Sequence, residues 1–312
     1  MVCYTAVMNK QEMIAEFAIR SSLVKDPKVS FLAGGFGNEN YLIQEGDLQY
    51  VLRLKKSDEP QFRDSLEREY IFLKYYNECG VVFCPKALYF DSRDNYLIES
   101  FLPGKLTLLK DFTNEQVDQF ARQLASLFHL SVPDFYVFCT KNNLRKYKQE
   151  DPISLLQKYG FERLAEAKRY GFSGESAAWL EGSLNENLEY FENQSVTAEL
   201  GFSWGDVQSS LIIGPGDEMY FYDFEHTVIS DFNDLAYIKI HSGFDSRQLE
   251  YFVERCAKYL NRSTDSLIFS MNASEKAIRT NDAIWAAWQW SQTGDASFEQ
   301  MLHERIALVK GL

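Results

Sequence analysis

The hydrophobic pattern of this 312-residue chain changes near Pro103, and that change limits the folds open to it. Before Pro103, short apolar runs alternate with turn residues, which predicts strands within 31–56, at 86–90 and at 95–100, accompanied by helices over 9–25 and 61–79. After Pro103, apolar residues recur at helical spacing, which predicts helices over 114–130, 152–170, 175–192, 247–261 and 275–292. Because the strands gather in one half, we expect an α+β protein with an antiparallel β-sheet lobe over 1–100 and a mostly helical lobe over 101–312.

The chain is acidic, with 45 Asp and Glu against 32 Lys and Arg and a formal charge of −13. Such a surface repels the phosphates of nucleic acids and anionic membranes, and it weakly favours a cationic small molecule as substrate. The five cysteines lack metal-ligand spacing, no leader pattern opens the chain, and no uncharged stretch approaches the roughly 18 residues of a membrane span. We therefore expect a cytoplasmic protein that has neither nucleic acid nor membrane as a partner. The sequence leaves its oligomeric state, monomer or homodimer, open.

Two aspartates lie on either side of a predicted hairpin in segment 203–225, SWGDVQSSLIIGPGDEMYFYDFE. Asp206 precedes the first strand, and Asp223 is expected to end the second. Phosphoryl transfer of the kinase type uses one carboxylate to orient the attacking hydroxyl and another to bind the magnesium that bridges the phosphates. Paired aspartates near a hairpin also occur in proteins of every kind, so the segment becomes informative only together with features upstream.

A glycine-rich turn separates the first two predicted strands, with the sequence Gly34-Gly35-Phe36-Gly37-Asn38. Glycines let a backbone approach a phosphate closely, and the N–H groups can then bind the anion. The alternative is an ordinary hairpin turn in which glycine serves only to reach positive φ.

Arg53 and Lys55 are two residues apart on the third predicted strand, so their side chains are expected on one face. A cation there could pair with nucleotide phosphates, or both side chains could face solvent. Glu69 borders the apolar stripe of helix 61–79 and is the candidate partner for that cation, with Glu67 as the solvent-side alternative.

Three further sets of residues are candidates by position. Glu99 to Phe101 links the predicted lobes and offers backbone groups to an adenine edge. Asp231 or Asn233 could cap the next helix, with Asp234 close by. Trp285, Trp288 and Trp290 are core residues by spacing, although their ring faces would also suit a quaternary ammonium or an aminated sugar.

This ordered set of motifs resembles the aminoglycoside phosphotransferase and choline kinase superfamily, the small-molecule relatives of protein kinases. The match covers most of the chain and rests on GGFGNENYLI, YVLRLKK, LEREYIFLKYY, YLIESFLPGK, ARQLASLFHL, WGDVQSSLII, YFYDFEHTVISDFNDLA and AIWAAWQWSQ. WGDVQSSLII corresponds to the HGDxxxxNIL of the family. The resemblance implies a bilobal protein-kinase-like fold and an ATP- and Mg²⁺-dependent transfer of phosphate to a hydroxyl of a small, cationic molecule.

Roles follow from the resemblance position by position. Asp206 would be the catalytic base, and Asp223 the principal magnesium ligand. The nucleotide would contact Gly35, Phe36, Gly37, Asn38, Arg53, Glu69, Glu99 and Phe101, and the acceptor would contact Glu225, Asp234, Trp285 and Trp288.

Two departures from the family pattern weaken this picture. Trp204 replaces the histidine of the motif, and Leu211, which cannot bind a metal, replaces its asparagine. Gln208 is a nearby oxygen donor for magnesium, and Ser210 would take the asparagine position if the loop is one residue shorter. The alternative function is therefore a catalytically impaired, pseudokinase-like binding or regulatory protein.

Overall fold

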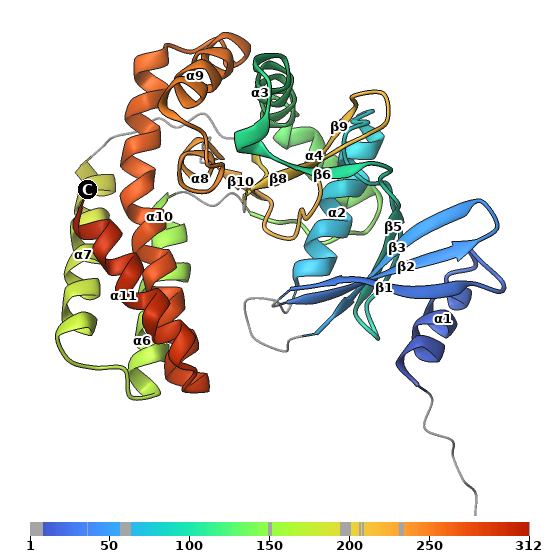
Figure 1. The fold of residues 1–312 in the computed structure, drawn as a ribbon, viewed down its shortest axis with the longest axis horizontal. Coiled ribbons are helices and arrows are strands. Elements are labelled where there is room, and N and C mark those ends of the chain that lie inside the picture. The colour runs from blue at the N-terminus through green and yellow to red at the C-terminus, as the bar shows by residue number, and fades with distance from the viewer. Residues whose placement is uncertain are drawn as a thin grey trace, which may run out of the picture. The chain divides into compact units, whose positions relative to one another are not determined.

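The computed structural model describes residues 9–35, 37–56, 64–148, 152–193, 201–205, 207, 209–230 and 234–311, which form two compact units (Figure 1). Unit 1 combines Met1–Thr107, Pro133–Lys146 and Ser210–Thr227. Unit 2 combines Leu108–Val132, Tyr147–Ser209 and Val228–Leu312. The β-rich unit therefore includes two segments that come much later in the chain than its sheet.

A five-stranded antiparallel sheet forms the centre of unit 1, in the order β1-β2-β3-β5-β4. Its strands are β1 (Lys28–Gly34), β2 (Asn38–Glu45), β3 (Leu48–Lys55), β4 (Ala87–Asp91) and β5 (Tyr96–Ser100). The predicted antiparallel sheet is thus confirmed. The prediction succeeded because apolar and polar residues alternate with a period of two along a strand, and this pattern is visible in the local sequence.

The two faces of this sheet carry different side chains. Helix α1 (Lys10–Arg20) packs Ile14, Phe17 and Ala18 against the face that bears Tyr41, Ile43, Leu52, Tyr96 and Ile98. Alternation along β3 places Arg53, the neighbour of Leu52, on the opposite face, and helix α2 (Ser65–Glu78) packs against strands β4 and β5.

The later segments of unit 1 add a small sheet, in the order β6-β8-β9, and helix α4 (Val132–Lys141). Its strands are β6 (Lys105–Leu108), β8 (Ser210–Ile213) and β9 (Met219–Tyr220). Strands β8 and β9 form the predicted hairpin, but β9 ends at Tyr220 and not at Asp223. The chain leaves the ladder because the Phe221 N–H donates to the Phe83 oxygen, 2.8 Å away.

Unit 2 is mostly helical, as predicted, with a short antiparallel pair formed by β7 (Gly201–Ser203) and β10 (Val228–Ser230). Its helices are α3 (Asn114–Phe128), α5 (Pro152–Leu155), α6 (Glu162–Arg169), α7 (Glu175–Asn193), α8 (Asp234–His241), α9 (Ser246–Leu260), α10 (Thr264–Thr293) and α11 (Ala296–Lys310). The 30-residue helix α10 packs against α11, α6 and α8. None of the helices in the described ranges has the length and apolar composition needed to cross a bilayer.

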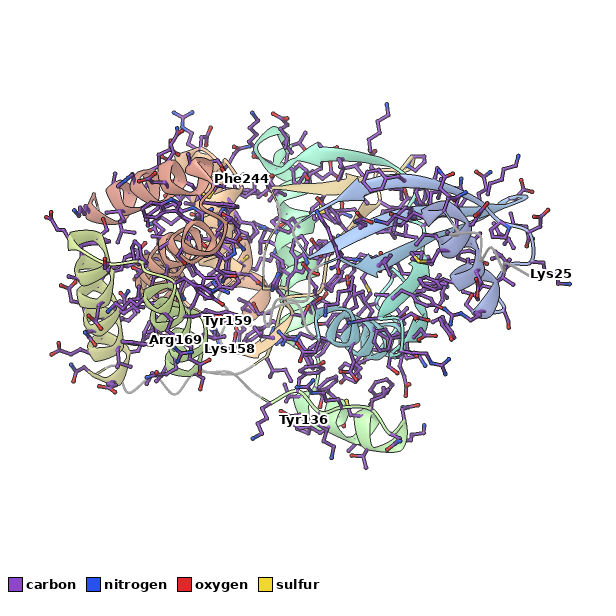
Figure 2. The ribbon with its side chains drawn as sticks, turned by 90° about the horizontal axis from the view of Figure 1, so that it is seen from below. Lys25, Tyr136, Lys158, Tyr159, Arg169 and Phe244 are labelled. Atoms are coloured by element: carbon purple, nitrogen blue, oxygen red, sulfur yellow. The ribbon has the colours of Figure 1, made fainter. Side chains whose placement is uncertain are left out.

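The predicted helix over 152–170 is interrupted by a π-helical turn, η3 (Leu156–Phe161), which carries Tyr159, one of the residues labelled in Figure 2. Gly160 allows this turn to pack closely. A Cβ at that position would lie 2.6 Å from Leu184 Cδ2 and 3.0 Å from Asn281 Oδ1. Such turns are often found next to functional sites.

Candidate active site

Arg53, near the end of β3, lies at the centre of a buried charged cluster in unit 1. Its Nη1 donates to Glu69 Oε1 at 2.5 Å, and its Nη2 donates to Asp223 Oδ1 at 2.7 Å. Only 6% of the Arg53 side chain and none of the Glu69 side chain is exposed, which excludes a solvent-facing role for Arg53. Burial alone would lower the pKa of Arg53, but the carboxylates of Glu69, Asp223, Glu99 and Glu225 raise it well above its ordinary value.

Glu69 connects helix α2 to the segment after the hairpin. The Phe224 N–H donates to the same Glu69 Oε1 at 2.8 Å, and the rings of Phe224 and Tyr76 lie 5.8 Å apart in an edge-to-face arrangement. Glu67, the sequence alternative, instead lies 3.6 Å from Arg145 Nη1 with 37% of its side chain exposed. The partner of Arg53 is therefore Glu69.

Asp223 and Glu225 differ in their surroundings. Asp223 has a left-handed backbone, with φ of 64°, and 27% of its side chain is exposed. Glu225 accepts a hydrogen bond from Asn38 Nδ2, and its carboxylate lies 3.4 Å from His226 Nε2. Burial would raise the pKa of Glu225, but His226, Arg53 and the Asn38 amide lower it to about 2, so this carboxylate is ionised. No pattern in the sequence pointed to His226, because its effect on the pKa of Glu225 depends on the distance between the two side chains.

Glu99 is the fourth carboxyl group of the cluster and lies on β5, opposite Val51 of β3. It is 6% exposed, and its Oε2 is buried without a hydrogen-bond partner among the described residues. Burial raises the pKa of Glu99 to about 7, with Arg53 opposing and Asp223 adding to the shift. In the linking segment, the Phe101 N–H donates to the Gln49 oxygen over a long 3.4 Å.

The glycine-rich turn is closed by its own backbone. The Gly35 N–H donates to the Asn38 oxygen at 2.9 Å, and the Lys56 N–H donates to the Gly37 oxygen at 2.8 Å. Neither Gly34 nor Gly35 has a positive φ, and a Cβ at Gly35 would meet only the Asn38 oxygen, at 4.0 Å. Among the described residues, therefore, nothing crowds a side chain at position 35, and Phe36 lies outside the described residues.

The two candidate residues of the loop in unit 2, Asp206 and Gln208, also lie outside the described residues, but the backbone just before them is described. The carboxylate of Asp234 accepts from Ser203 Oγ at 2.7 Å and from the Trp204 and Gly205 N–H groups at 3.0 Å each. Asp234 is 1% exposed, so its carboxylate is committed to this loop. The predicted helix caps Asp231 and Asn233 are outside the described residues as well.

A model of the phosphotransferase enzyme family matches residues 28–261. The chain belongs to this family. It is thereby a member of the superfamily of aminoglycoside phosphotransferases and choline kinases that its motifs indicated. The comparison with curated proteins found no match.

Solved structures of this superfamily resemble the chain at low sequence identity. Choline kinase LicA from Streptococcus pneumoniae is 17% identical with a TM-score of 0.72, over 97% of this chain and 100% of that one. An ethanolamine kinase from Plasmodium vivax is 15% identical with a TM-score of 0.71, over 96% and 89%. Aminoglycoside 2'-phosphotransferase-IIIa, in a GDP complex, is 18% identical with a TM-score of 0.68, over 97% and 98%. This likeness confirms the predicted kinase-like α+β fold.

The two residues that depart from the family motif are both buried. Trp204 and Leu211 are each fully buried, so neither side chain is available to a ligand. Ser210, the alternative to Leu211, has its Oγ 3.0 Å from Tyr222 Oη. Of the candidate acceptor residues, Trp288 is 3% exposed and belongs to the core of unit 2, and Trp285 is partly buried against that core.

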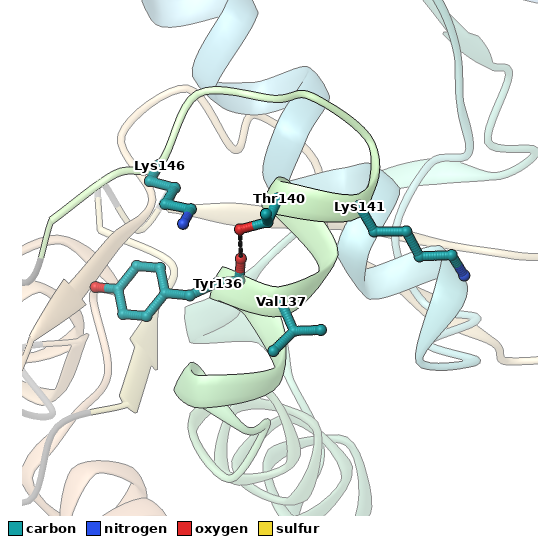
Figure 3. Close-up of a pocket in the computed structure, with 5 residues that line it drawn as sticks. All are labelled: Tyr136, Val137, Thr140, Lys141 and Lys146. Atoms are coloured by element: carbon teal, nitrogen blue, oxygen red, sulfur yellow. Dashed lines mark hydrogen bonds between the residues drawn. The ribbon is translucent and has the colours of Figure 1, made fainter.

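An open pocket of about 400 Å³ lies on helix α4 of unit 1 (Figure 3). It is lined by Tyr136, Val137, Thr140, Lys141 and Lys146. None of the predicted site residues lines this pocket, so it is separate from the Arg53 cluster.

Proposed function

We propose that the protein transfers the terminal phosphate of ATP, with Mg²⁺, to a hydroxyl group of a small molecule. The observation that carries the proposal is the guanidinium of Arg53 bonded to both Glu69 and Asp223. A strand cation paired with a helix glutamate, beside an aspartate that follows a hairpin, is the arrangement used for phosphoryl transfer in kinases. Membership of the phosphotransferase family supports the same activity.

The nucleotide would bind to the glycine-rich turn and to Arg53. Gly35 is exposed, so a phosphate could approach the turn closely, and Arg53 is a permanent cation. The backbone of Glu99–Phe101 would contact the base. Several related structures contain nucleotides, namely AMP with LicA, GDP with aminoglycoside 2'-phosphotransferase-IIIa and ATP with a further aminoglycoside phosphotransferase.

The acidic surroundings of Arg53 fit a magnesium ion. Asp223 keeps 27% of its side chain exposed, and magnesium bound with nucleotide needs only one or two carboxylates besides phosphates and water. Within the described ranges, no group of three or more His, Cys, Asp or Glu is placed to hold a metal by itself. The ligands that we propose for the ion are Asp223, Gln208 and the nucleotide. The bound ion would neutralise charge on the bridging phosphates.

Asp206 would orient the acceptor hydroxyl and accept its proton. Asp234 would position Asp206 indirectly, because its three hydrogen bonds fix the backbone of 203–205 just before it. Catalysis would then come from positioning and from electrostatic stabilisation of the transferred phosphate.

Two alanine variants test these roles. Asp206→Ala is expected to bind ATP normally and to lose turnover, whereas Asp223→Ala is expected to lose Mg²⁺-dependent ATP binding. Calorimetric titration with ATP, with and without Mg²⁺, measures binding, and release of ADP with an acceptor panel measures turnover. Asp265→Ala, an exposed aspartate on α10, is the matched control. Normal turnover in both site variants would refute the assigned roles.

A specific observation favours a second candidate, a catalytically impaired binding protein. Leu211 is fully buried at the position where the family motif has its asparagine, so that metal ligand is lost. ATP binding with Mg²⁺ but no turnover across amino sugars, choline, ethanolamine, thiamine and macrolides would favour this alternative.

The formal charge of −13 favours a cationic acceptor. Arginine contacts on the rings of Trp285 and Trp288 argue against an aromatic cage for it. The proposal includes a cytoplasmic location, which the free thiols of Cys79, Cys84, Cys139 and Cys256 support.

A further inference from the structure

Helix α4 is held firmly in unit 1 by one of its faces. The ring of Phe135 stacks on that of Phe72 of α2, with 5.1 Å between the ring centres, and meets the ring of Tyr75 at 5.2 Å in an edge-to-face arrangement. Phe138, one turn further along α4, has its ring 5.5 Å from that of Tyr75. These aromatic contacts fix the position of α4, so a ligand on its other face would meet a preformed surface.

That other face carries the pocket of about 400 Å³ and has few polar groups to offer (Figure 3). Tyr136, Val137 and Thr140 line it, and Val137 is 65% exposed. The Thr140 hydroxyl donates to the Tyr136 backbone oxygen at 2.8 Å, so its proton is used within the helix. The solvent face of a surface helix is normally polar, and this one instead presents an apolar surface to a ligand.

The charged residues that line the pocket are both lysines, Lys141 and Lys146. Both are exposed, and neither forms a salt bridge with another described residue. Arg145, which lies between them in sequence, differs in this respect, because its Nη1 lies 2.9 Å from Asp64 Oδ2 and 3.6 Å from Glu67 Oε2. Two positive charges that the described residues do not neutralise thus border an apolar pocket, in a chain whose formal charge is −13.

The size of the pocket favours a small molecule over a protein partner. Its volume lies within the range of about 300–1,000 Å³ that is usual for small-molecule sites. A stable protein interface needs about 20–30 residues on each side, many more than the five drawn in Figure 3. Lysine stems pack along apolar surfaces while their ammonium groups stay in water, which places the positive charge at the edge of the pocket. A ligand with an apolar body and an anionic end complements this arrangement.

The donors at the pocket suit a carboxylate better than a phosphate. A phosphate monoester carries a charge of about −1.5 to −2 and three strongly accepting oxygens, and proteins commonly bind it with guanidinium groups or loop N–H groups. Among the described lining residues, the charged donors are the ammonium groups of Lys141 and Lys146. Two ammonium groups are sufficient for one carboxylate, which carries a single charge on two oxygens.

We propose that the α4 pocket binds an amphipathic carboxylate of the medium-chain fatty acid type. The apolar chain lies against Tyr136, Val137 and Thr140, and the carboxylate pairs with Lys141 and Lys146 at the edge. This site is independent of the proposed kinase function, because none of its residues belongs to the Arg53 cluster and its ligand can be tested without nucleotide.

Calorimetric titration of the full-length protein without nucleotide tests the ligand class. The probes are decanoate, octanoate, acetate, decyltrimethylammonium and decyl phosphate, each below its micelle concentration and at equal ionic strength. We expect decanoate to bind about three- to tenfold more tightly than octanoate, since each buried methylene contributes about fourfold, and acetate and decyltrimethylammonium not to bind measurably. Decyl phosphate binding more tightly than decanoate would overturn the assignment of a carboxylate, and equal binding of decyltrimethylammonium would overturn the role of the lysines.

Variants of exposed residues test the location of the site. Val137→Asp should weaken decanoate binding at least about tenfold, because it removes an apolar contact and adds a repelling charge. Lys146→Gln should weaken it about two- to fivefold, as expected for an exposed ion pair, and Lys146→Arg should retain it. Lys148→Gln, at an exposed lysine that does not line the pocket, is the matched control and should bind as the wild type does. Wild-type affinity in both Val137→Asp and Lys146→Gln would refute the proposed site.

Two measurements on the unaltered protein keep the test independent of the variants. A decanoate that carries a diazirine should, on illumination, label the segment 136–146, as mapped by peptide mass spectrometry, and excess decanoate should suppress the label. Labelling confined to other segments would overturn the inference. Sedimentation tests a competing occupant, a second copy of this chain. A dimer that Val137→Asp abolishes and decanoate does not dissociate would assign the pocket to that second copy instead.

Discussion

Replacing Glu99 by glutamine is expected to change how the stability of unit 1 depends on pH. Glu99 is buried on β5 near Arg53, and burial raises its pKa from an ordinary 4.5 to about 7. The difference corresponds to about 3 kcal/mol, since each pKa unit is equivalent to about 1.4 kcal/mol. Glutamine has nearly the same size and does not titrate, so the substitution removes the titration of this side chain.

The sign of the effect follows from which state binds the proton. Below pH 4.5 the carboxyl group is protonated in both the folded and the unfolded chain, and Glu99 carries no penalty. Between pH 4.5 and about 7 the unfolded chain releases the proton while the folded chain keeps it, so the free energy of unfolding falls. Above pH 7 the full penalty of about 3 kcal/mol applies.

Calorimetric melting at pH 5 and pH 8 measures this difference. Part of the penalty already applies at pH 5, because the unfolded pKa is 4.5, so about 2.5 kcal/mol is added between pH 5 and pH 8. At about 2 °C per kcal/mol, Glu99→Gln should gain about 5 °C in Tm relative to the wild type over this interval. Any free-energy cost of accommodating the glutamine amide in the folded protein is the same at both pH values, so it cancels in the comparison. Glu78→Gln, exposed on α2, is the control and should show no gain. A Tm difference between Glu99→Gln and the wild type that is equal at both pH values would show that Glu99 does not titrate as inferred.

Three other substitutions have expected outcomes. Arg53→Met leaves the carboxylate of Glu69 buried and unpaired, so it should lower the free energy of unfolding by about 3–5 kcal/mol in urea titrations and abolish ATP binding. Gly104→Ala should destabilise unit 1 by more than about 3 kcal/mol, because its φ is 142° and the new Cβ would lie 2.3 Å from the Ile213 oxygen; an unchanged Tm would contradict this. Asp234→Asn should preserve ATP binding and reduce kcat about a hundredfold, since one amide cannot accept all three hydrogen bonds; full activity would show that the loop before Asp206 does not depend on it.

Local patterns in the sequence determined much of unit 1. Alternation of apolar residues predicted the strands of the main sheet, and the helical stripe of 61–79 predicted α2 with Glu69 at its buried edge. The partnership of Arg53 and Glu69, which are 16 residues apart, followed from these two elements once the resemblance to kinases was recognised. In unit 2, the helical spacing of apolar residues predicted most helices, but it missed α11 and the first part of α10. These two helices pack against each other, and their buried faces are clear only from that packing.

The tertiary structure alone decided what surrounds each charged group. Arg53 and Asp223 are 170 residues apart, and Asn38 and Glu225 are 187 residues apart, so no periodicity in the sequence could pair them. The raised pKa of Glu99 and the arginines on the faces of Trp285 and Trp288 likewise depend on burial and on neighbours from distant segments. The sequence by itself determined which elements form, because periodicity is a property of neighbouring residues. Only packing determined the charge and the contacts of the site, because desolvation and Coulomb interactions depend on distance in space.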